Sequence, residues 1–405
     1  MYNKFKDNIQ VLCTNAVDFK GLKTEDGKFV SQDHPYYRKY RDIDITRFVS
    51  TTGVLNNSTL YGKEFIKLKV LCDSCQLNMN DNTLHYFISQ GPVLNDNFKL
   101  ILKKSENFKP DLIHATYLPY SVLLYSLILS KKLKIPCYCT PFYHIYNPRY
   151  EKEPIIDIMK NFDVIFSCTE VEKNFFIKHG LSSEKIYTIP MGVDIQLYSN
   201  PVLSKSGKKK SFCRVFGVDK PFIFYCGYKN HEKGAIDVLK AAKIIVKKNK
   251  NVNFVFIGPS THSFDIELKK ARKKGIKILN LTPSNLKGYF DWRKISAFQE
   301  CSVFVMPSRS DAYGMVYLEA WAAKKAVIGA RNEVMKSIIE DGKDGYLVEY
   351  NNPNQLAELI LRLLSNPELA DNLGNKGYQK IKNNNSWSKI TNTIKEFYEK
   401  IIPRS

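Results

Sequence analysis

No stretch of the 405-residue sequence is apolar for long enough to cross a membrane as a helix. The longest apolar stretch, residues 118–129, is interrupted by Pro119, Ser121 and Ser126, whereas a spanning helix needs about 20 consecutive apolar residues. The N-terminal segment, MYNKFKDNIQVLC, also lacks the apolar core and the cleavage site of a secretory signal peptide. We therefore expect a cytoplasmic protein.

The sequence is also poor in metal-binding patterns. Cys72 and Cys75 have the CxxC spacing of a metal or redox site, but no second CxxC pair follows at the distance found in zinc ribbons. Because there is no export signal, all nine cysteines are expected to be reduced thiols with a structural role. We therefore expect neither a metal site nor a bound cofactor.

Acidic residues are few relative to basic ones. The 40 Asp and Glu residues stand against 61 Lys and Arg, which gives a net charge of +21. One explanation is an anionic partner, such as a phosphorylated substrate or an anionic membrane surface to which the protein would bind peripherally; the other is compositional drift, since Lys far outnumbers Arg. No nucleic-acid-binding motif is present and the basic runs are scattered, so no specific nucleic-acid partner is expected.

The second half of the sequence alternates short apolar runs with segments of helical periodicity. Continuous apolar strands separated by helices predict a parallel sheet covered on both faces, as in a Rossmann-like domain. The expected strands are residues 222–227, 252–258, 277–282, 303–308, 326–330 and 345–349.

The first half shows the same alternation less regularly, with helical patterns at about residues 62–78, 120–132 and 171–179. We predict one α/β domain over residues 1–195, completed by a C-terminal helix at 386–405, and a second over 212–385, with 196–211 as a polar, basic linker. Ligands of such sheets bind at the carboxyl ends of the strands. The expected strands of the first domain are residues 8–14, 43–49, 111–116, 137–142, 164–169 and 185–191.

The strongest group of candidate functional residues follows strand 303–308. Asp311 lies in the loop, and Gly314 allows close backbone approach where a helix begins. The free N–H groups of residues 314–316 would then form a phosphate site, with Glu319 about one turn further on. Two carboxylates around a phosphate site suit a nucleotide sugar, although Asp311 as a helix cap and Glu319 as a solvated helix residue remain the structural alternative.

Two further candidates follow other strands. Lys233 and Gly234 open the helix after strand 222–227, where the ammonium could reach a diphosphate. His144 follows strand 137–142, where it could donate a hydrogen bond to a sugar or a phosphate. Taken singly, Lys233 is better explained as an ordinary surface lysine and His144 as a packed histidine.

Together these motifs resemble the family-four retaining glycosyltransferases of the GT-B fold (glycosyl transferases group 1). The resemblance covers about residues 8–400. It is carried by Asp111-Leu-Ile-His114 ("PDxxH"), Ile189-Pro-Met-Gly192-Val-Asp194 ("IPNGVD"), Gly227…Lys233-Gly234 ("GRxxxxKG"), Asp311…Tyr-Gly…Leu318-Glu319-Ala ("ExFGxxxxEA"), Asp341-Gly342…Asp344-Gly345-Tyr-Leu-Val ("DGxxGxLV") and the aromatic residue Trp387.

The resemblance implies two Rossmann-like domains facing across a cleft, an N-terminal acceptor domain and a C-terminal donor domain. It implies transfer of a sugar from a nucleoside-diphosphate-sugar, without metal and with retained configuration, to a hydroxyl acceptor. A glycan or lipid-linked glycan as the acceptor fits the basic charge balance, which would draw the protein to an anionic membrane surface. Catalytic roles fall to His144, Lys233 and Asp311. Donor binding falls to Gly227, Tyr228, Lys229, Lys233, Ser308, Asp311, Tyr313, Gly314, Met315, Val316 and Glu319.

The sequence departs from the family in three places. Asp311 stands where Glu is usual, and Tyr228 stands where a diphosphate-binding Arg is usual, with Lys229 as a substitute cation. The N-terminal domain is also expected to lack the family's first strand and its Gly-rich loop. A catalytically impaired GT-B scaffold that binds nucleotide or glycan without turnover is therefore the alternative to an active enzyme.

Overall fold

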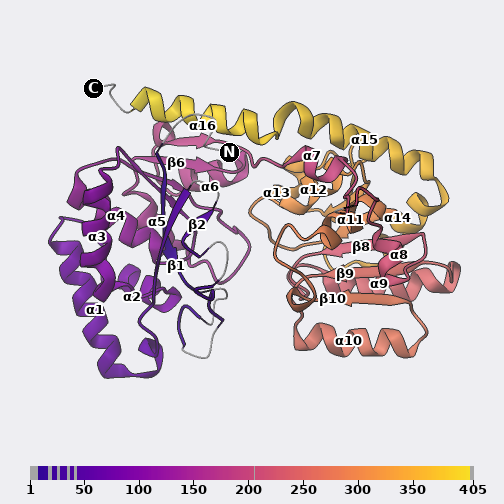
Figure 1. The fold of residues 1–405 in the computed structure, drawn as a ribbon, viewed down its shortest axis with the longest axis horizontal. Helices are drawn as coiled ribbons and strands as arrows, with labels where there is room; N and C mark the ends of the chain where they lie inside the picture. Colours follow the sequence, from indigo (N-terminus) through magenta and orange to yellow (C-terminus); the bar gives the residue numbers. More distant parts are fainter. Residues whose placement is uncertain are drawn as a thin grey trace. The chain divides into compact units, whose positions relative to one another are not determined.

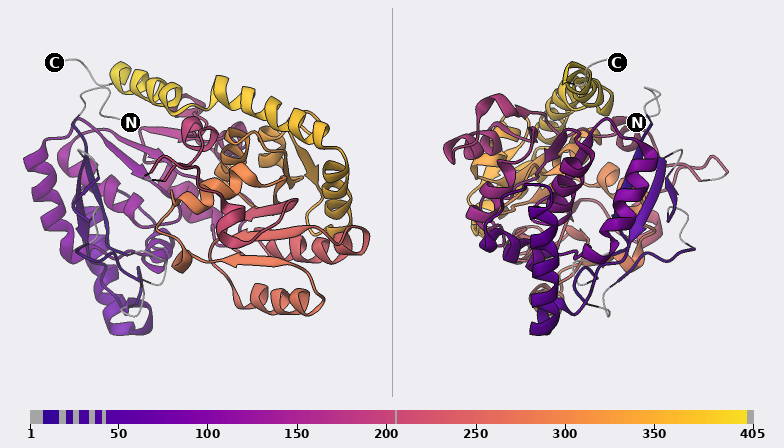
Figure 2. Two further views of the ribbon diagram at one scale, coloured as in Figure 1. Left: turned by 45° about the vertical axis from the view of Figure 1, so that its right-hand side comes forward. Right: turned by 90° about the vertical axis from the view of Figure 1, so that its left-hand side faces the viewer.

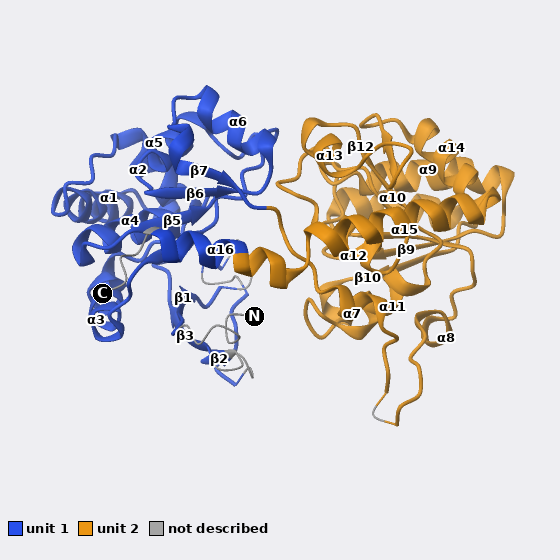
Figure 3. Ribbon diagram, turned by 90° about the horizontal axis from the view of Figure 1, so that it is seen from above, with its two compact units in different colours: residues 1–189, 393–405 blue, residues 190–392 orange. Residues whose placement is uncertain are grey.

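The computed structural model describes residues 8–16, 21–24, 28–33, 37–40, 43–204 and 206–401. The chain divides into two compact units (Figure 3). Unit 1 comprises Met1–Ile189 and Thr393–Ser405, and unit 2 comprises Pro190–Asn392. Each unit has a parallel α/β sheet, so the predicted fold class is confirmed. The division falls before the predicted linker 196–211, all of which belongs to unit 2.

Unit 2 is built on a six-stranded parallel sheet with the order β10-β9-β8-β11-β12-β13 (Figure 1). Strands β8, β9 and β11 are buried along their whole length, as expected for strands covered on both faces. All six strands predicted in the second half are confirmed. They are β8 (Phe222–Cys226), β9 (Asn253–Ile257), β10 (Ile278–Leu281), β11 (Val303–Met306), β12 (Val327–Ala330) and β13 (Tyr346–Val348).

The helices of unit 2 pack around this sheet in two groups. One group contains α9, α10 and α14, and the other contains α7, α11 and α12. The helices are α7 (Ile195–Ser199), α8 (Phe212–Phe216), α9 (Ala235–Lys248), α10 (His262–Lys273), α11 (Trp292–Glu300), α12 (Met315–Ala322), α13 (Glu333–Ile338), α14 (Pro353–Ser365) and α15 (Pro367–Asn384). Because α7 packs against α11 and α12, the start of the predicted linker is a fixed part of this unit.

Unit 1 has its strands in two separate sheets. One is the parallel sheet β4-β5-β6-β7, and the other has the order β1-β3-β2. Among the described residues, no strand pairs with the outer edge of β4 or with the second edge of β1. The strands are β1 (Gln10–Thr14), β2 (Lys39–Tyr40), β3 (Ile43–Phe48), β4 (Ile113–Thr116), β5 (Cys137–Thr140), β6 (Val164–Ser167) and β7 (Ile186–Thr188).

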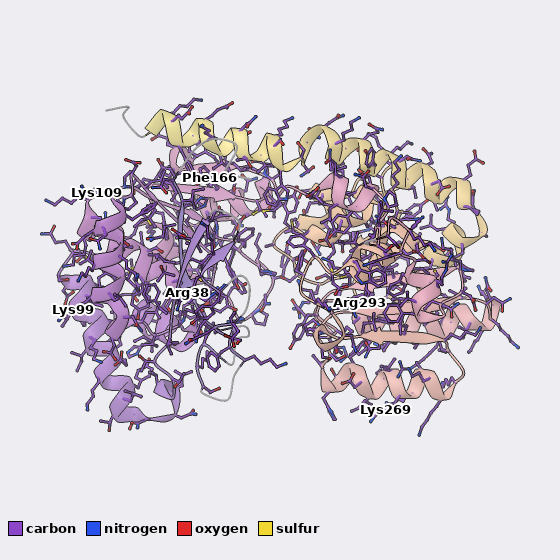
Figure 4. The ribbon with its side chains drawn as sticks, viewed as in Figure 1. Arg38, Lys99, Lys109, Phe166, Lys269 and Arg293 are labelled. Atoms are coloured by element: carbon purple, nitrogen blue, oxygen red, sulfur yellow. The ribbon has the colours of Figure 1, made fainter. Side chains whose placement is uncertain are left out.

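The C-terminal helix α16 (Trp387–Ile401) begins in unit 2 and ends in unit 1. In unit 1, Phe397 packs 5.5 Å from Phe166 of β6, a core residue labelled in Figure 4. The hydroxyl of Tyr398 hydrogen-bonds Nδ1 of His114, whose Nε2 bonds Thr140 Oγ1 at 2.8 Å. Burial lowers the pKa of His114 to about 4, so this motif residue is a neutral structural link. Residues 402–405 of the predicted helix lie outside the described residues.

The described residues of unit 1 also form six α-helices before α16, and three of these were not expected. Helices α2, α3 and α5 join those predicted at 62–78, 120–132 and 171–179. The helices are α1 (Ser58–Asp73), α2 (Asp81–Gln90), α3 (Phe98–Phe108), α4 (Val122–Leu133), α5 (Lys152–Met159) and α6 (Glu170–Lys178). Within the described parts of the chain, no helix is both long and apolar enough to span a membrane.

Candidate active site

The loops that carry Lys233 and Asp311 meet because their strands are neighbours. Strands β8 and β11 pair in parallel at the centre of the unit 2 sheet, so the loops after them leave the same edge. The ammonium of Lys233 donates to the carbonyl oxygen of Ser310 at 2.7 Å and lies 3.2 Å from Asp311 Oδ2. Both side chains are partly exposed, at 20% and 15%. A cation and a carboxylate, predicted separately, thus form one ion pair in reach of solvent.

Gly234 lets these two loops touch. Its φ is +72°, and a Cβ there would lie 2.3 Å from the carbonyl oxygen of Pro307. The backbone bond from Arg309 N–H to Glu232 O, at 2.8 Å, joins the loops alongside. A side chain at this position would therefore push Lys233 away from Asp311.

Helix α12 begins directly after the candidate residue Gly314. Gly314 has φ +85°, and a Cβ there would lie 2.6 Å from the ring of Tyr317, so only glycine fits on both counts. The backbone N–H groups of Met315 and Val316 lie in the first turn, where a helix offers donors without intrahelical partners. These amides suit an anion at the helix N-terminus.

Glu319 is a buried hub rather than a solvated helix residue. It is 2% exposed, and its Oε1 accepts from Lys294 Nζ at 2.8 Å, Tyr198 OH at 2.6 Å and Tyr289 OH at 2.9 Å. Burial and the nearby carboxylate raise the pKa values of Tyr198 and Tyr289, so both hydroxyls stay protonated and donate. Among the described residues, Oε2 has no hydrogen-bond partner and is itself buried, so one oxygen of this carboxylate is an unsatisfied acceptor inside the fold.

Ser308 orders the loop between β11 and α12. It is fully buried, and its hydroxyl donates to the carbonyl oxygen of Ser310 at 2.8 Å. That carbonyl is also the acceptor for Lys233. Ser308 therefore positions the lysine, and its contacts give it a structural role in the loop.

Lys229 differs from its expected role. Its side chain is fully buried, and Nζ donates to Asn280 Oδ1 at 2.5 Å and Leu281 O at 3.0 Å. Burial lowers its pKa to about 8. The ammonium is thus hydrogen-bonded to the C-terminal end of β10. It does not replace the family's arginine at the loop surface. Tyr228 is half-exposed, and its carbonyl accepts from Tyr225 OH at 2.8 Å, with Gly227 preceding it at the end of β8.

Tyr313 connects the loop between β11 and α12 to Asn385 and Met191, near the two ends of unit 2 in the sequence. Its hydroxyl accepts from Asn385 Nδ2 at 2.8 Å, and the same amide group donates to Met191 O at 2.8 Å. Trp387 lies beside Gly192, where a Cβ would come within 2.6 Å of the indole ring. Residues 190–194 of the first motif and Trp387 therefore pack together within unit 2.

His144 belongs to unit 1 and lies in the loop after β5. Its ring is partly buried, 5.2 Å from that of Tyr150. The preceding residue, Tyr143, donates its backbone N–H to Glu172 Oε1 at 2.7 Å, and Glu172 Oε2 accepts from Cys168 N–H at 2.6 Å. Glu172 thus links the loop after β5, which contains His144, to the turn after β6. Burial raises its pKa to about 7, against the opposing effect of the two N–H bonds.

We expect Glu172 to make stability depend on pH. Its folded pKa of about 7 is raised from an ordinary 4.5. As the pH rises, the Glu172 carboxyl therefore loses its proton in the unfolded chain before it does so in the folded protein. The bound proton contributes about 3 kcal/mol to the free energy of unfolding below pH 4.5, and this contribution is lost as the pH rises to 7. Urea unfolding of wild type and Glu172→Gln across this range should show their difference in unfolding free energy shrinking by about that amount; a difference independent of pH would contradict it.

Lys294, Tyr198 and Tyr289 were not predicted as site residues from the sequence. Lys294 precedes the buried Phe298 by four residues on α11, so it shares the helix face that points inward. That spacing was the sign in the sequence that Lys294 is buried. No comparable pattern in the sequence marked Tyr198 or Tyr289 as site residues. In the described part of the chain, no group of three or more His, Cys, Asp or Glu side chains is arranged as metal ligands.

Two protein-family models match the chain. The model "Glycosyl transferases group 1" matches residues 208–380, within unit 2, and "Glycosyltransferase Family 4" matches residues 84–197, mostly in unit 1. An uncharacterised glycosyltransferase of Methanocaldococcus jannaschii is 29% identical over 72% of this chain and 76% of its own length. A trehalose synthase of Thermococcus litoralis is 29% identical over 52% of this chain. The match spans about half of that relative's own length, 52%.

Solved structures share the fold at low sequence identity. HepE of Anabaena, in complex with UDP and glucose, has a TM-score of 0.63 and 16% identity over 75% of this chain and 81% of its own. A glycosyltransferase of Rickettsia africae has a TM-score of 0.65 and 16% identity over 99% of this chain and 100% of its own. One glycosyltransferase family model thus matches each unit, and the architecture is the GT-B fold of the solved glycosyltransferases, so the chain is similar to the group 1 and family 4 glycosyltransferases over both units.

Proposed function

We propose that the protein transfers a sugar from a nucleoside-diphosphate-sugar to a hydroxyl acceptor with retention of anomeric configuration. The observation that carries this proposal is Glu319, whose buried Oε2 lacks a hydrogen-bond partner and which lies on the helix that also presents its N-terminal amides. A carboxylate oxygen of this kind accepts from a ribose hydroxyl, while helix amides bind the diphosphate. HepE, which has the same fold, binds UDP and UDP-glucose, so uridine is the first base to test.

The roles of the other residues follow from their charges. Lys233 and the amides of Met315 and Val316 would stabilise the negative charge that develops on the leaving diphosphate. Asp311, held beside Lys233, would accept from hydroxyls of the donor sugar. By family resemblance, His144 would approach the donor sugar from unit 1.

We propose that the reaction needs no metal ion, because Lys233 and the α12 amides supply the positive charge. No carboxylate is assigned as a nucleophile. In the proposed same-face substitution, the bond from the sugar C1 to the phosphate oxygen breaks, the acceptor oxygen bonds to C1, and the acceptor proton passes to the departing phosphate. The acceptor is proposed to be a hydroxyl of a glycan or a lipid-linked glycan.

Proton NMR of the sugar released from UDP-glucose and its analogues tests this proposal with water as acceptor. An initial product with the donor's own anomeric configuration, formed at the same rate with EDTA present, is expected. Inverted product would contradict retention, and loss of turnover in EDTA would contradict metal independence.

A non-catalytic scaffold is the second candidate. It is favoured by the burial of Lys229, which leaves Tyr228 without a neighbouring cation of its own loop to replace the family's arginine. Nucleotide binding without measurable release of sugar would select this alternative.

A further inference from the structure

The segment between α7 and α8 is a β-hairpin rather than a featureless linker. Leu203 and Lys209 form an antiparallel bridge, Ser204 N–H donates to Lys208 O at 2.8 Å, and Lys210 N–H donates to Val202 O at 2.8 Å. Figure 3 shows this segment beside α8, extending from the body of unit 2. We call residues 202–204 and 206–215, the described part of the hairpin and most of α8, the basic hairpin surface.

The basic hairpin surface is rich in cations and free of acids. From residue 195 to residue 218 the sequence contains no Asp or Glu, and its basic residues are Lys205, Lys208, Lys209, Lys210 and Arg214. Lys208, Lys209 and Arg214 are exposed, and none makes an ion pair with a described residue. Lys210 lies over the ring of Trp292 at 4.9 Å. The carboxylate of Glu300 on α11 accepts from Ser211, Phe212 and Cys213 beside these cations. It is the acid that contacts this surface among the hydrogen bonds of the described residues, and the five basic residues leave a positive excess around it.

Two exposed apolar side chains accompany these cations. Leu203, paired with Lys209 across the hairpin, is 55% exposed, and Val215 on α8 is 59% exposed. Exposed apolar groups gain nothing from a soluble polyanion, but they are stabilised at the boundary between lipid headgroups and acyl chains. Lysines next to them attract anionic headgroups. The combination matches a membrane interface better than it matches a nucleic acid.

We propose that the basic hairpin surface docks unit 2 on anionic lipid. The lysines and Arg214 contact the headgroups, and Leu203 enters the interfacial layer. Each basic residue near an anionic bilayer strengthens binding about fivefold, and the attraction weakens as salt screens it. This docking goes beyond the proposed sugar transfer, because it requires neither donor nor turnover.

Co-sedimentation with vesicles tests the proposal on the full chain. Wild-type protein is expected to bind phosphatidylcholine vesicles that contain phosphatidylglycerol, and to bind pure phosphatidylcholine vesicles weakly. Lys208→Glu/Lys209→Glu is expected to reduce the binding to phosphatidylglycerol vesicles at least about 25-fold. The control is Lys273→Glu/Lys274→Glu, which makes the same change in net charge at two exposed lysines at the end of α10, and it is expected to keep most of the binding.

Two further results separate lipid docking from general attraction to anions. Leu203→Ser is expected to weaken vesicle binding while leaving heparin binding unchanged, because only a bilayer offers the side chain an apolar layer. An equal loss in both lysine pairs would show that overall charge alone acts, and would overturn the proposal. An unaffected Leu203→Ser variant would overturn it in favour of a polyanion site. Thermal unfolding of each variant, matched to wild type, shows that the fold is intact.

Discussion

Replacing Lys233 with alanine is expected to lower kcat for sugar transfer about 10²- to 10³-fold. The ammonium is anchored by the Ser310 carbonyl and Asp311 at the loop surface. In the proposed reaction it faces the diphosphate, on which negative charge grows as the sugar leaves. An interaction that strengthens toward the transition state appears in kcat rather than in KM alone. Initial rates of UDP release over a range of donor concentrations measure both constants.

Lys247→Ala is the matched control for this experiment. Lys247 lies on the same helix, α9, and is exposed near its C-terminal end. Its removal is expected to leave kcat and KM unchanged. A Lys233→Ala variant with wild-type kcat would show that the lysine only holds the two loops together.

Replacing Glu319 with glutamine is expected to reduce the free energy of unfolding by about 3–5 kcal/mol, because it leaves a buried ammonium without its counter-charge. The Lys294 and Glu319 side chains are 5% and 3% exposed and lie 2.8 Å apart. The glutamine carbonyl can still accept from Tyr198 and Tyr289, so the lost charge dominates the effect. Urea unfolding measures it.

The double variant Lys294→Met/Glu319→Gln separates stability from ligand binding. Removal of both charges is expected to restore most of the lost stability, since an apolar side chain replaces the buried ammonium. Nucleotide affinity should stay at least about tenfold weaker than that of wild type, because the charged acceptor for the ribose is gone. Recovery of both properties would mean that Glu319 serves only the core.

Most strands of unit 2 were predictable because they are buried on both faces and therefore appear in the sequence as continuous apolar runs, whereas the edge strand β10 is only partly buried. Helices in unit 1 were harder to recognise. Helix α5 has Pro154 in its first turn, where proline is tolerated, yet the sequence around it suggests a loop. Helix α2 begins among polar residues, with Asn80 capping the N–H of Thr83. In both helices, packing in the interior outweighs a weak local signal.

The predicted linker also carried a signal that was not used. Gly207, with φ +77°, lies in the turn of the hairpin, and its N–H donates to the carbonyl oxygen of Ser204 at 3.0 Å. The composition of 196–211 indicated a flexible basic segment. Whether the backbone pairs across a turn depends on the order of the residues on either side of the glycine. Composition alone contains no information about that order.

The candidate site was predictable where glycine and strand ends mark it. Asp311, Gly314 and Lys233 follow neighbouring strands, so parallel pairing alone brings them together. Lys229 and Lys294 are different, because both are lysines in a lysine-rich chain. Their ammonium groups turn inward to acceptors on other elements, and local sequence patterns do not encode such contacts.

The measurement that tests the central claim most directly is thermal stability against a panel of UDP, GDP, ADP and their sugars. Wild type and the double variant Lys294→Met/Glu319→Gln should be compared in parallel. We expect one nucleotide and its sugars to raise the melting temperature of wild type, and the same ligands to have little effect on the double variant. No shift of wild type with any nucleotide, or equal shifts in both proteins, would contradict a donor site at Glu319.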